Sequence, residues 1–381
     1  MNAKTIMVVA GDPSGDAIAA DLVRALAAAL PSVRFIGAGG PRMAGAGVAN
    51  SFDLTADAVI GVSDVLHKLP RFFRHKRRLT QLAVEQKPEW IILVDFEFFN
   101  RFLARAIRSQ APPGWRPKIV KYVSPQVWAS RPGRAAKLAR DFDLLLCLFP
   151  FEKEWYARRL PAFRVEFVGH PMFDRCLVPV CKPSQVPVVL LLPGSRRAEL
   201  KRHLPAILGA ARMIAAKQPA RFKLVAPSEE MAALVRAFQA GAGPEIEIQI
   251  GQLEEALSQA TVAIASTGTV TLECAYFGVL TVALYKTSLW TYWIGRRVVT
   301  VKYLAMPNLL ANEPIYPEFI QHQATAANIA GAALELLGDP ARRQEIQSKL
   351  ARVISTLGGP GAAQRAAAAV LKLTDAGYNQ S

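Results

Sequence analysis

The chain has few cysteines, no long apolar run and no recognisable processing site near its start. Its four cysteines are scattered (Cys147, Cys176, Cys181 and Cys274), and no Cys/His partners lie at zinc-like spacing. We therefore expect free thiols in a reducing cytoplasm. No uninterrupted apolar run reaches about 18 residues, so we expect no membrane-spanning helix. The first residues lead directly into a strand-and-turn pattern without a small-residue cleavage site, so we expect no signal peptide.

Acidic residues are also in short supply. The sequence has 46 Lys and Arg against 30 Asp and Glu, a formal net charge of +16. Such an excess favours an anionic partner, which could be nucleic acid, an anionic membrane or a phosphorylated substrate. With 381 residues, 51% of them hydrophobic, the chain is long enough for two domains, each with its own core.

Strand-like and helix-like segments alternate almost to the end of the chain. Residues 171–187 interrupt the pattern with four prolines and no periodicity, so they predict a linker. We therefore predict two doubly wound α/β domains, 1–170 and 188–340. Residues 341–381 are expected to be helical and could pack back on the first domain. The expected strands are 5–10, 34–38, 90–95, 118–124, 143–149 and 164–169 in the first domain, and 188–192, 222–227, 245–250, 261–265 and 280–285 in the second.

Ligands of such sheets bind at the carboxyl ends of the strands, where the first domain places three candidate side chains. Asp12 lies in a Gly-Asp-Pro-Ser-Gly-Asp turn after the first strand, where Ser14 or Asp16 could cap the next helix but capping does not explain Asp12. Asp95 ends a buried strand among aromatic residues, where it is either a general base or a helix N-cap. His170 follows the last strand, and a lone histidine there is more often structural than catalytic.

In the second domain, the same order of strand, Gly/Ser turn and helix occurs at 192–199 and again at 266–273. Helix N-termini present free N–H groups and a positive dipole end to an anion, which suits a diphosphate. Arg196 adds a cation beside one of these turns. Glu273, about one helical turn after the other, could accept hydrogen bonds from a ribose diol. A loop bearing Asn308 follows, while an ordinary capped helix remains the alternative explanation of 266–273.

Asp141-Phe142-Asp143 matches the Asp-x-Asp pattern with which some sugar-nucleotide enzymes hold a divalent metal. These aspartates stand at the start of a strand, opposite the ligand edge of the sheet. We therefore expect no metal there, and no metal or cofactor elsewhere.

As a set, the motifs resemble the lipid-A-disaccharide synthase family, in that family's order and roughly its spacing. They are GDPSGD (11–16), YVSPQVWA (122–129), LFPFEKEWY (148–156), FVGHPM (167–172), LLPGSRRAE (191–199), STGTVTLE (266–273) and MPNLLANEPIYPEFIQ (306–321). The resemblance implies a GT-B glycosyltransferase, with two Rossmann-like domains facing across a cleft and the sugar nucleotide held mainly by the second. It also implies an inverting transfer of 2,3-diacylglucosamine from its UDP conjugate to the 6-hydroxyl of 2,3-diacylglucosamine 1-phosphate. The product would be a β-1,6-linked disaccharide.

The resemblance also implies roles for individual residues. It places the catalytic base on Asp95, for which Asp12 and His170 are alternatives. The UDP-sugar site falls on Ser195, Arg196, Thr267, Gly268, Thr269, Glu273 and Asn308.

Five positions depart from the family pattern, one of them Phe98, which stands at a position that is often polar. Asp12 stands where glutamate is usual, Ser130 where tryptophan is often found, and Thr267 where the loop has serine. Glu97 replaces a proline, which makes it a rival base two residues from Asp95.

The basic segment LHKLPRFFRHKRRL (66–79) has six Lys or Arg residues and no carboxylate. Its mixture of cationic and apolar side chains fits the surface of an anionic membrane, where acylated substrates reside. Residues 289–302 have a similar mixture, and a solvated helix face is the alternative for both. We expect a cytoplasmic protein held peripherally at the inner membrane. The membrane or acceptor contacts are predicted at Leu69, Phe72, Phe73, Arg74 and Arg77.

Two other functions remain open. One is another UDP-sugar GT-B enzyme, such as a murein-precursor transferase or an epimerase, against which the YVSPQVWA and PNLLA runs argue. The other is a non-catalytic basic homologue that binds nucleotide or nucleic acid, although no nucleic-acid-binding module is recognisable. The sequence does not decide acyl-chain preference or whether the chain forms a homodimer.

Overall fold

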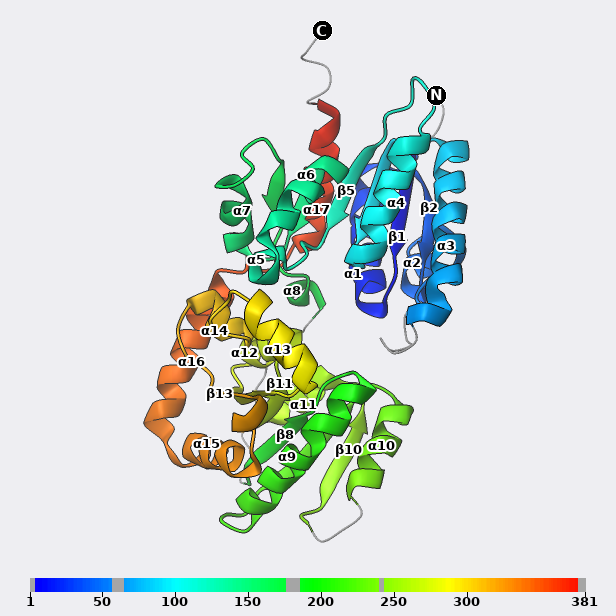
Figure 1. The fold of residues 1–381 in the computed structure, drawn as a ribbon. Coiled ribbons are helices and arrows are strands. Elements are labelled where there is room, and N and C mark those ends of the chain that lie inside the picture. Colours follow the sequence, from blue (N-terminus) through cyan, green and yellow to red (C-terminus); the bar gives the residue numbers. More distant parts are fainter. Residues whose placement is uncertain (1–3, 57–64, 176–185, 240–242, 376–381) are drawn as a thin grey trace. The chain divides into compact units, whose positions relative to one another are not determined.

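The computed structural model describes residues 4–56, 65–175, 186–239 and 243–375, without the side chains of 65–69, 374 and 375. The chain forms two compact units (Figure 1). Unit 1 comprises Met1–Arg175 and Leu357–Ser381, and unit 2 comprises Cys176–Thr356. Each is described separately below.

Within the described ranges, unit 1 is built on a sheet of seven parallel strands. Apart from Thr5, the central strands β1 and β4 are apolar and buried, as expected for a sheet covered on both faces. The strands are β1 (Thr5–Ala10), β2 (Arg34–Gly39), β3 (Val48–Asp53), β4 (Trp90–Val94), β5 (Lys118–Tyr122), β6 (Leu144–Cys147) and β7 (Val165–Phe167). Their spatial order is β3-β2-β1-β4-β5-β6-β7.

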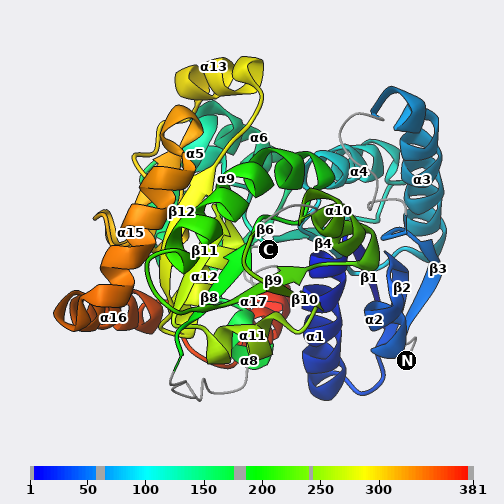
Figure 2. The ribbon, with the colours of Figure 1, turned by 90° about the horizontal axis from the view of Figure 1, so that it is seen from below.

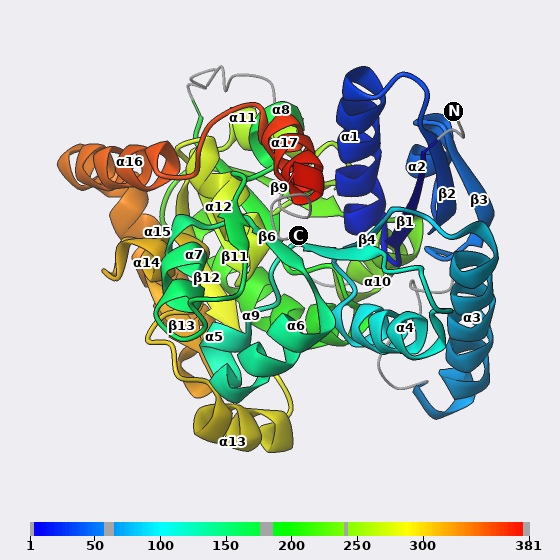
Figure 3. The same ribbon diagram turned by 90° about the horizontal axis from the view of Figure 1, so that it is seen from above.

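The helices of unit 1 form two layers. They are α1 (Pro13–Ala29), α2 (Pro41–Gly45), α3 (Val65–Gln86), α4 (Glu97–Gln110), α5 (Val127–Ser130), α6 (Ala135–Asp141), α7 (Pro150–Ala157), α8 (Met172–Arg175) and α17 (Ala362–Asp375). Figure 3 shows α1 and α17 on one side of the sheet and α4 and α6 on the other. The C-terminal helix α17 thus packs against the first helix of the chain.

The described part of unit 2 has six parallel strands in the order β10-β9-β8-β11-β12-β13. They are β8 (Val188–Leu192), β9 (Arg221–Ala226), β10 (Ile246–Ile250), β11 (Val262–Ser266), β12 (Leu280–Tyr285) and β13 (Glu318–Ile320). Figure 2 shows two of its helices, α9 and α15, side by side. The helices are α9 (Arg197–Ala215), α10 (Glu229–Gln239), α11 (Leu253–Gln259), α12 (Thr269–Tyr276), α13 (Leu289–Val298), α14 (Met306–Ala311), α15 (Ala326–Gly338) and α16 (Pro340–Ser355).

The prediction of two doubly wound α/β units is confirmed. Two edge strands, β3 and β13, were missing from the prediction because neither is an apolar run; in β3, buried or half-buried positions alternate with exposed ones. Of the predicted helical segment 341–381, α16 lies in unit 2 and α17 in unit 1. Most of the predicted linker, 176–185, is outside the described residues, as are Cys176 and Cys181.

Strand order identifies the ligand edge of each sheet. In unit 1 the order reverses between β1 and β4, and in unit 2 between β8 and β11. At such a switch point the loops leaving the two strands diverge, so that the carboxyl ends are open to a ligand. Asp12 and Asp95 follow β1 and β4, while Gly194–Arg196 and Thr267–Thr269 follow β8 and β11.

Candidate functional site

Unit 2 has a cavity of about 440 Å³ at its switch point. This volume suits a nucleotide-sized ligand. Six of the seven residues predicted for the UDP-sugar site line it, namely Ser195, Arg196, Thr267, Gly268, Thr269 and Glu273. The others are Leu192, Gly194, Glu199, Val225, Pro227, Gly251, Leu253, Ser266 and Val270.

Two glycines shape the backbone around this cavity. Gly194 has φ +114°, and a Cβ there would lie 2.8 Å from Oε2 of Glu199. Gly268 has φ +123° and is the N-cap residue of α12. Only glycine adopts these angles without strain. Because α9 and α12 both begin at the cavity, their free N–H groups and positive dipole ends favour an anion there.

Arg196 stands at the start of α9 as an exposed cation. Its side chain is 75% exposed, and Nη1 lies 3.2 Å from Oε1 of Glu199. An exposed ion pair of this kind contributes little to stability. The guanidinium is therefore available to an anionic ligand, to which it can donate two parallel hydrogen bonds.

Glu273 provides a carboxyl group inside the same cavity. Burial, followed by repulsion from Glu254, raises the pKa of Glu273 to about 7. No described residue donates a hydrogen bond to this carboxyl group, so its acceptor oxygens remain available for hydroxyl groups of a ligand.

Asn308 lies outside this set of lining residues. It is completely buried, and its amide is fully used: Oδ1 accepts from the Tyr316 N–H (2.7 Å), and Nδ2 donates to Tyr316 O (2.8 Å) and Glu318 Oε1 (2.7 Å). Glu318 also accepts from the N–H groups of Leu304 (2.9 Å) and Ala305 (3.0 Å). This geometry favours a structural role for Asn308.

The segment that Asn308 organises contacts the start of α12 at the cavity. Ala305 forms a parallel β-bridge with Gly268, and the Met306 N–H donates to Thr271 Oγ1 (3.0 Å). Thr271 in turn donates to Gly268 O (2.7 Å). The PNLLA run therefore acts on the cavity by holding the start of α12 in place.

His203 was missed by the sequence reasoning. It is completely buried in α9, and Nε2 accepts from the Lys286 N–H (2.9 Å). Nδ1 therefore carries the proton and donates to Pro193 O (2.7 Å), while burial lowers the pKa of His203. This neutral ring ties the end of β8 to the end of β12. No sequence signal distinguishes it from any other helical histidine.

In unit 1, Asp12 and Asp95 meet at the switch point. Asp12 is the N-cap of α1, where Oδ1 accepts from the Gly15 N–H (2.6 Å). A Cβ at Gly15 would lie 3.3 Å from this oxygen and 3.5 Å from the Cβ of Asp95. Burial, and to a lesser extent the neighbouring Asp95, raise the pKa of Asp12. The cap of α1 is therefore Asp12 itself, and the expectation that Ser14 or Asp16 caps this helix is wrong, since the Asp16 carboxylate accepts from the N–H groups of Gly40 and Met43.

The backbone at Asp95 is strained. Asp95 and Phe96 have φ +45° and +42°, a left-handed conformation that costs free energy for residues other than glycine. The Phe96 ring packs over Gly11, where a Cβ would lie 2.2 Å from it. Asn100 Nδ2 donates to Val94 O (3.1 Å) and Asp95 O (2.6 Å). These contacts hold a strained turn of the kind that concentrates at functional sites.

Asp95 is not a helix cap. The N-cap residue of α4 is Phe96, and no described residue donates a hydrogen bond to the Asp95 carboxylate. The capping alternative therefore does not explain an aspartate at this position, and the carboxylate is available to a substrate.

Lys121 lies in the middle of this acidic group and is another residue that sequence reasoning missed. Its side chain is buried in β5, and Nζ donates to the Asp95 carbonyl oxygen. Burial lowers the pKa of Lys121, opposed by attraction to Glu97, Asp95 and Asp12. Burial likewise raises the pKa of Glu97, which Lys121 partly offsets. The available signal was a lysine between Val120 and Tyr122, in a strand-like run after Lys118.

His170 is in a different part of unit 1. It follows β7, three strands from β4, which places it roughly 14 Å along the sheet at the usual strand spacing. Burial lowers the pKa of His170 to about 4, with a further contribution from Arg175. Its Nδ1 accepts from the Met172 N–H (3.3 Å), and its ring packs against Phe149. These contacts favour the structural interpretation of His170.

Glu152 joins two of the sequence motifs in the core of unit 1. Its carboxylate accepts from Trp128 Nε1 (2.9 Å) and from the Phe149 N–H (3.1 Å). Burial raises the pKa of Glu152 to about 7. The YVSPQVWA and LFPFEKEWY runs are thus linked through a buried hydrogen-bonded carboxyl group.

Asp141 and Asp143 form ion pairs with arginines. Both carboxylate oxygens of Asp141 lie 3.0 Å from Arg105 Nε, and Asp143 Oδ2 accepts from Arg108 (2.9 Å). No group of three or more His, Cys, Asp or Glu residues suited to a metal ion occurs in the described part of the chain.

The basic segment forms part of α3. Phe72 packs among Phe99 and other rings of the core, whereas Phe73 and, from α4, Phe98 are 53% and 66% exposed. Arg74 and Arg77 are exposed as well, and the Leu69 side chain is outside the described residues. Across the described ranges, the search for a helix of sufficient length and hydropathy to cross a bilayer finds none.

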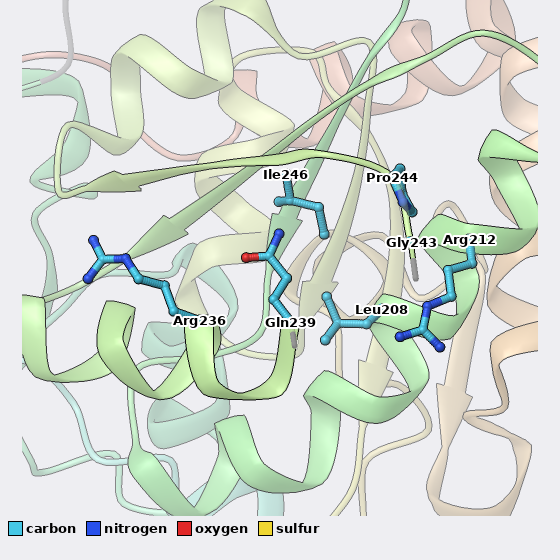
Figure 4. Close-up of a pocket in the computed structure, with 7 residues that line it drawn as sticks. All are labelled: Leu208, Arg212, Arg236, Gln239, Gly243, Pro244 and Ile246. Atoms are coloured by element: carbon cyan, nitrogen blue, oxygen red, sulfur yellow. The ribbon is translucent and has the colours of Figure 1, made fainter. Parts of the chain in front are cut away.

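A second cavity in unit 2, of about 300 Å³, lies at the opposite edge of the sheet (Figure 4). Arg212 and Arg236 stand on opposite sides of it, with Leu208, Gln239 and Ile246 between them. The last turns of α9 and α10 carry negative partial charge, and Arg236 is paired with Glu229 (2.5 Å). This cavity is a poorer site for a diphosphate than the switch-point cavity.

Known proteins resemble the whole of this chain. Residues 6–373 match the profile of the family described as lipid-A-disaccharide synthetase. The lipid-A-disaccharide synthase of Myxococcus xanthus is 35% identical over 387 residues, covering 99% of each chain.

Solved structures resemble the fold. A UDP-GlcNAc 2-epimerase from Neisseria meningitidis, bound to UDP-GlcNAc, has a TM-score of 0.66 at 12% identity and covers 97% of this chain and 100% of its own. A glycosyltransferase from Rickettsia africae has a TM-score of 0.55 at 11% identity, covering 100% of both chains. At these identities the likeness concerns the fold alone.

Proposed function

The chain belongs to the lipid-A-disaccharide synthetase family, and from that premise we propose that it transfers 2,3-diacylglucosamine from UDP-2,3-diacylglucosamine to 2,3-diacylglucosamine 1-phosphate. It is a GT-B glycosyltransferase, and the products are the β-1,6-linked disaccharide 1-phosphate and UDP. The observation that carries the proposal is the switch-point cavity of unit 2, where six residues expected around a UDP-sugar come together.

In the proposed complex, unit 2 holds the UDP group. The diphosphate lies at the N-termini of α9 and α12, where Ser195, Gly268 and Thr269 present backbone or hydroxyl donors. Arg196 exchanges Glu199 for a phosphate oxygen, and Glu273 accepts hydrogen bonds from the ribose hydroxyl groups. Leaving-group charge is thus stabilised by residues of this chain.

Unit 1 supplies the base. The Asp95 carboxylate takes the proton of the acceptor 6-hydroxyl as that oxygen attacks the anomeric carbon on the face opposite UDP. The bond from this carbon to the UDP oxygen breaks, and UDP leaves with the electron pair, so the configuration inverts. Lys121 and Asn100 donate hydrogen bonds to the Asp95 carbonyl oxygen. They thereby fix the strained backbone that carries the carboxylate.

The direct test is to incubate the purified protein with both substrates and to measure the disaccharide and UDP. We expect both products in equal amounts. Formation of an isomerised UDP-sugar without acceptor would favour an epimerase, and UDP binding without turnover would favour a non-catalytic homologue.

The pH dependence of UDP binding should report on Glu273. A diol donates more strongly to a carboxylate than to a carboxylic acid, and the pKa of Glu273 is raised to about 7. The carboxyl group is therefore mostly protonated below that pH, and affinity should increase about tenfold from about pH 6 to about pH 8. Titration calorimetry at both pH values would measure this increase and the accompanying proton release.

Glu273→Gln is the control for that measurement, because it keeps the shape of the side chain but cannot titrate. Any pH dependence that remains in this variant belongs to UDP itself. Equal pH dependence in the two proteins would show that Glu273 does not contact the ribose.

We also propose that unit 1 contacts an anionic membrane through α3 and the start of α4. The exposed Phe73 and Phe98 with Arg74 and Arg77 provide apolar and cationic groups together. Arg74→Glu with Arg77→Glu should weaken binding to anionic vesicles, since each basic residue near such a surface contributes about 1 kcal/mol. Vesicle co-sedimentation at low and high salt would measure the loss.

Lys217→Glu with Arg221→Glu is the matched control, because it makes the same change in net charge at the amino edge of the unit 2 sheet. If both double variants lose binding equally, only net charge matters, and the solvated-helix interpretation of α3 is correct.

A further inference from the structure

Helix α13 has no buried residue in its own unit. Of its ten residues, Leu289, Trp290, Trp293 and Ile294 are exposed, Trp290 to 82% and Trp293 to 59%. Figure 2 shows the helix projecting from unit 2. Tryptophan is normally one of the most buried side chains in a protein, so two exposed ones within four residues are unusual.

Local interactions do not account for this helix. Ser288 caps it, accepting from the Thr291 N–H (3.2 Å), but a cap contributes only about 1 kcal/mol. Isolated helices shorter than about 12 residues are marginal in water and depend on packing of an apolar face. Several large exposed apolar side chains on one short helix are typical of a surface that another component covers.

The charges around α13 indicate which component that is. Residues 286–302 contain four Lys or Arg residues and no Asp or Glu. Arg296 and Arg297 occupy the last turn of the helix, and Arg296 lies over the Tyr292 ring. Trp and Tyr side by side with basic residues are typical of a helix that lies in the interface of an anionic bilayer. A contact between protein chains would need acidic residues opposite this surface or fewer charges on it.

The position of α13 relative to the unit 2 sheet indicates what a membrane contact would do. The helix follows β12, which pairs in parallel with β11, so it begins at the same carboxyl edge on which the switch-point cavity lies. A bilayer beneath α13 would lie at this edge of unit 2. A nucleotide-sugar whose acyl chains remain in the membrane could then reach the cavity.

We propose that α13 is a membrane-docking helix of unit 2. Trp290 and Trp293 enter the boundary between head groups and acyl chains of an anionic bilayer, and Arg296 and Arg297 contact the head-group phosphates. The proposed function supplies the reason for this contact, a lipid-linked donor, but the contact itself is testable without turnover.

The test uses the full chain with vesicles of phosphatidylglycerol and phosphatidylcholine. It compares the wild-type protein with a double variant that carries both Trp290→Ser and Trp293→Ser. We expect the lipid concentration for half-maximal co-sedimentation to increase about tenfold or more, because two large apolar anchors are lost. Arg296→Glu with Arg297→Glu should reduce binding to these vesicles and make the remaining binding less dependent on salt. Vesicles of phosphatidylcholine alone should bind the wild-type protein more weakly.

Met213→Ser with Ile250→Ser is the matched control, since both residues are exposed and apolar and belong to unit 2. This control should bind vesicles like the wild type. All variants should retain wild-type UDP affinity, which shows that unit 2 is folded.

Two results would overturn the proposal. One is wild-type vesicle binding by the tryptophan double variant. The other is a wild-type dimer that this variant converts to a monomer without any change in vesicle binding, since α13 would then be a contact between copies of the chain. Failure of the wild-type protein to bind UDP would count against the proposed function and would leave the vesicle result intact.

Discussion

Asp95→Asn is expected to reduce turnover by at least about 10²-fold, the low end of the contribution of general-base catalysis. Asparagine keeps the size of the side chain but cannot take the proton of the acceptor hydroxyl. The Asp95 carboxylate has no cap to make and no described hydrogen-bond donor, so the substitution should leave the fold intact. UDP affinity should not change, because the proposed nucleotide site belongs to unit 2. Steady-state kinetics and titration calorimetry would measure the two quantities.

Glu97→Gln provides the comparison for Asp95→Asn. Glu97 is the nearest rival carboxylate, and burial raises its pKa, as it would for a base or acid used near neutral pH. If Glu97→Gln loses turnover and Asp95→Asn keeps it, the base lies two residues further along the chain. Asp12→Asn should have a smaller effect than Asp95→Asn, because its capping acceptor at the start of α1 is retained.

Arg196→Ala should weaken UDP binding by about tenfold or more, since a charge-assisted hydrogen bond contributes about 1.5–3 kcal/mol. In the free protein this guanidinium is largely exposed and held only by Glu199, so its removal should cost little stability. Calorimetry with UDP would measure the loss, and thermal unfolding would check stability.

Arg197→Ala is the matched control for that experiment. Arg197 is the next residue, is also exposed, and pairs with Glu230 instead of lining the cavity. It should keep UDP affinity close to that of the wild type. Equal losses of UDP affinity in the two variants would show that only general charge attraction matters. In a separate test, abolition of wild-type activity by EDTA would contradict diphosphate binding without a metal.

Local sequence patterns determined the layout of this protein. Apolar runs of strand length alternate with helical periodicity, and parallel sheets bury such runs on both faces, so the class of fold follows from the pattern. The turns at Gly194 and Gly268 predicted a ligand site at the switch point of unit 2, because a glycine and serine turn before a helix start is a local sequence pattern. The family resemblance assigned the reaction through motifs that are themselves short and local.

Those local patterns did not predict the contacts between segments that are distant in the sequence. Asn308 matched a nucleotide-site motif, yet its amide is used by Tyr316 and Glu318. Phe72 and Phe73 are equivalent in sequence, but helical geometry turns one toward Phe99 and the other toward solvent. Whether a polar group is free for a ligand depends on neighbours that only the folded chain supplies.

By itself, then, the sequence determined the order of all strands except the edge strands β3 and β13, the loops that we propose as ligand sites, and the family. Tertiary structure alone decided that Asp95 has a strained backbone whose carbonyl oxygen accepts from the buried Lys121. It also decided that α13 exposes two tryptophans. The physical reason is range: periodicity and turn chemistry act over a few residues. Burial and hydrogen-bond partners are set by segments tens of residues apart.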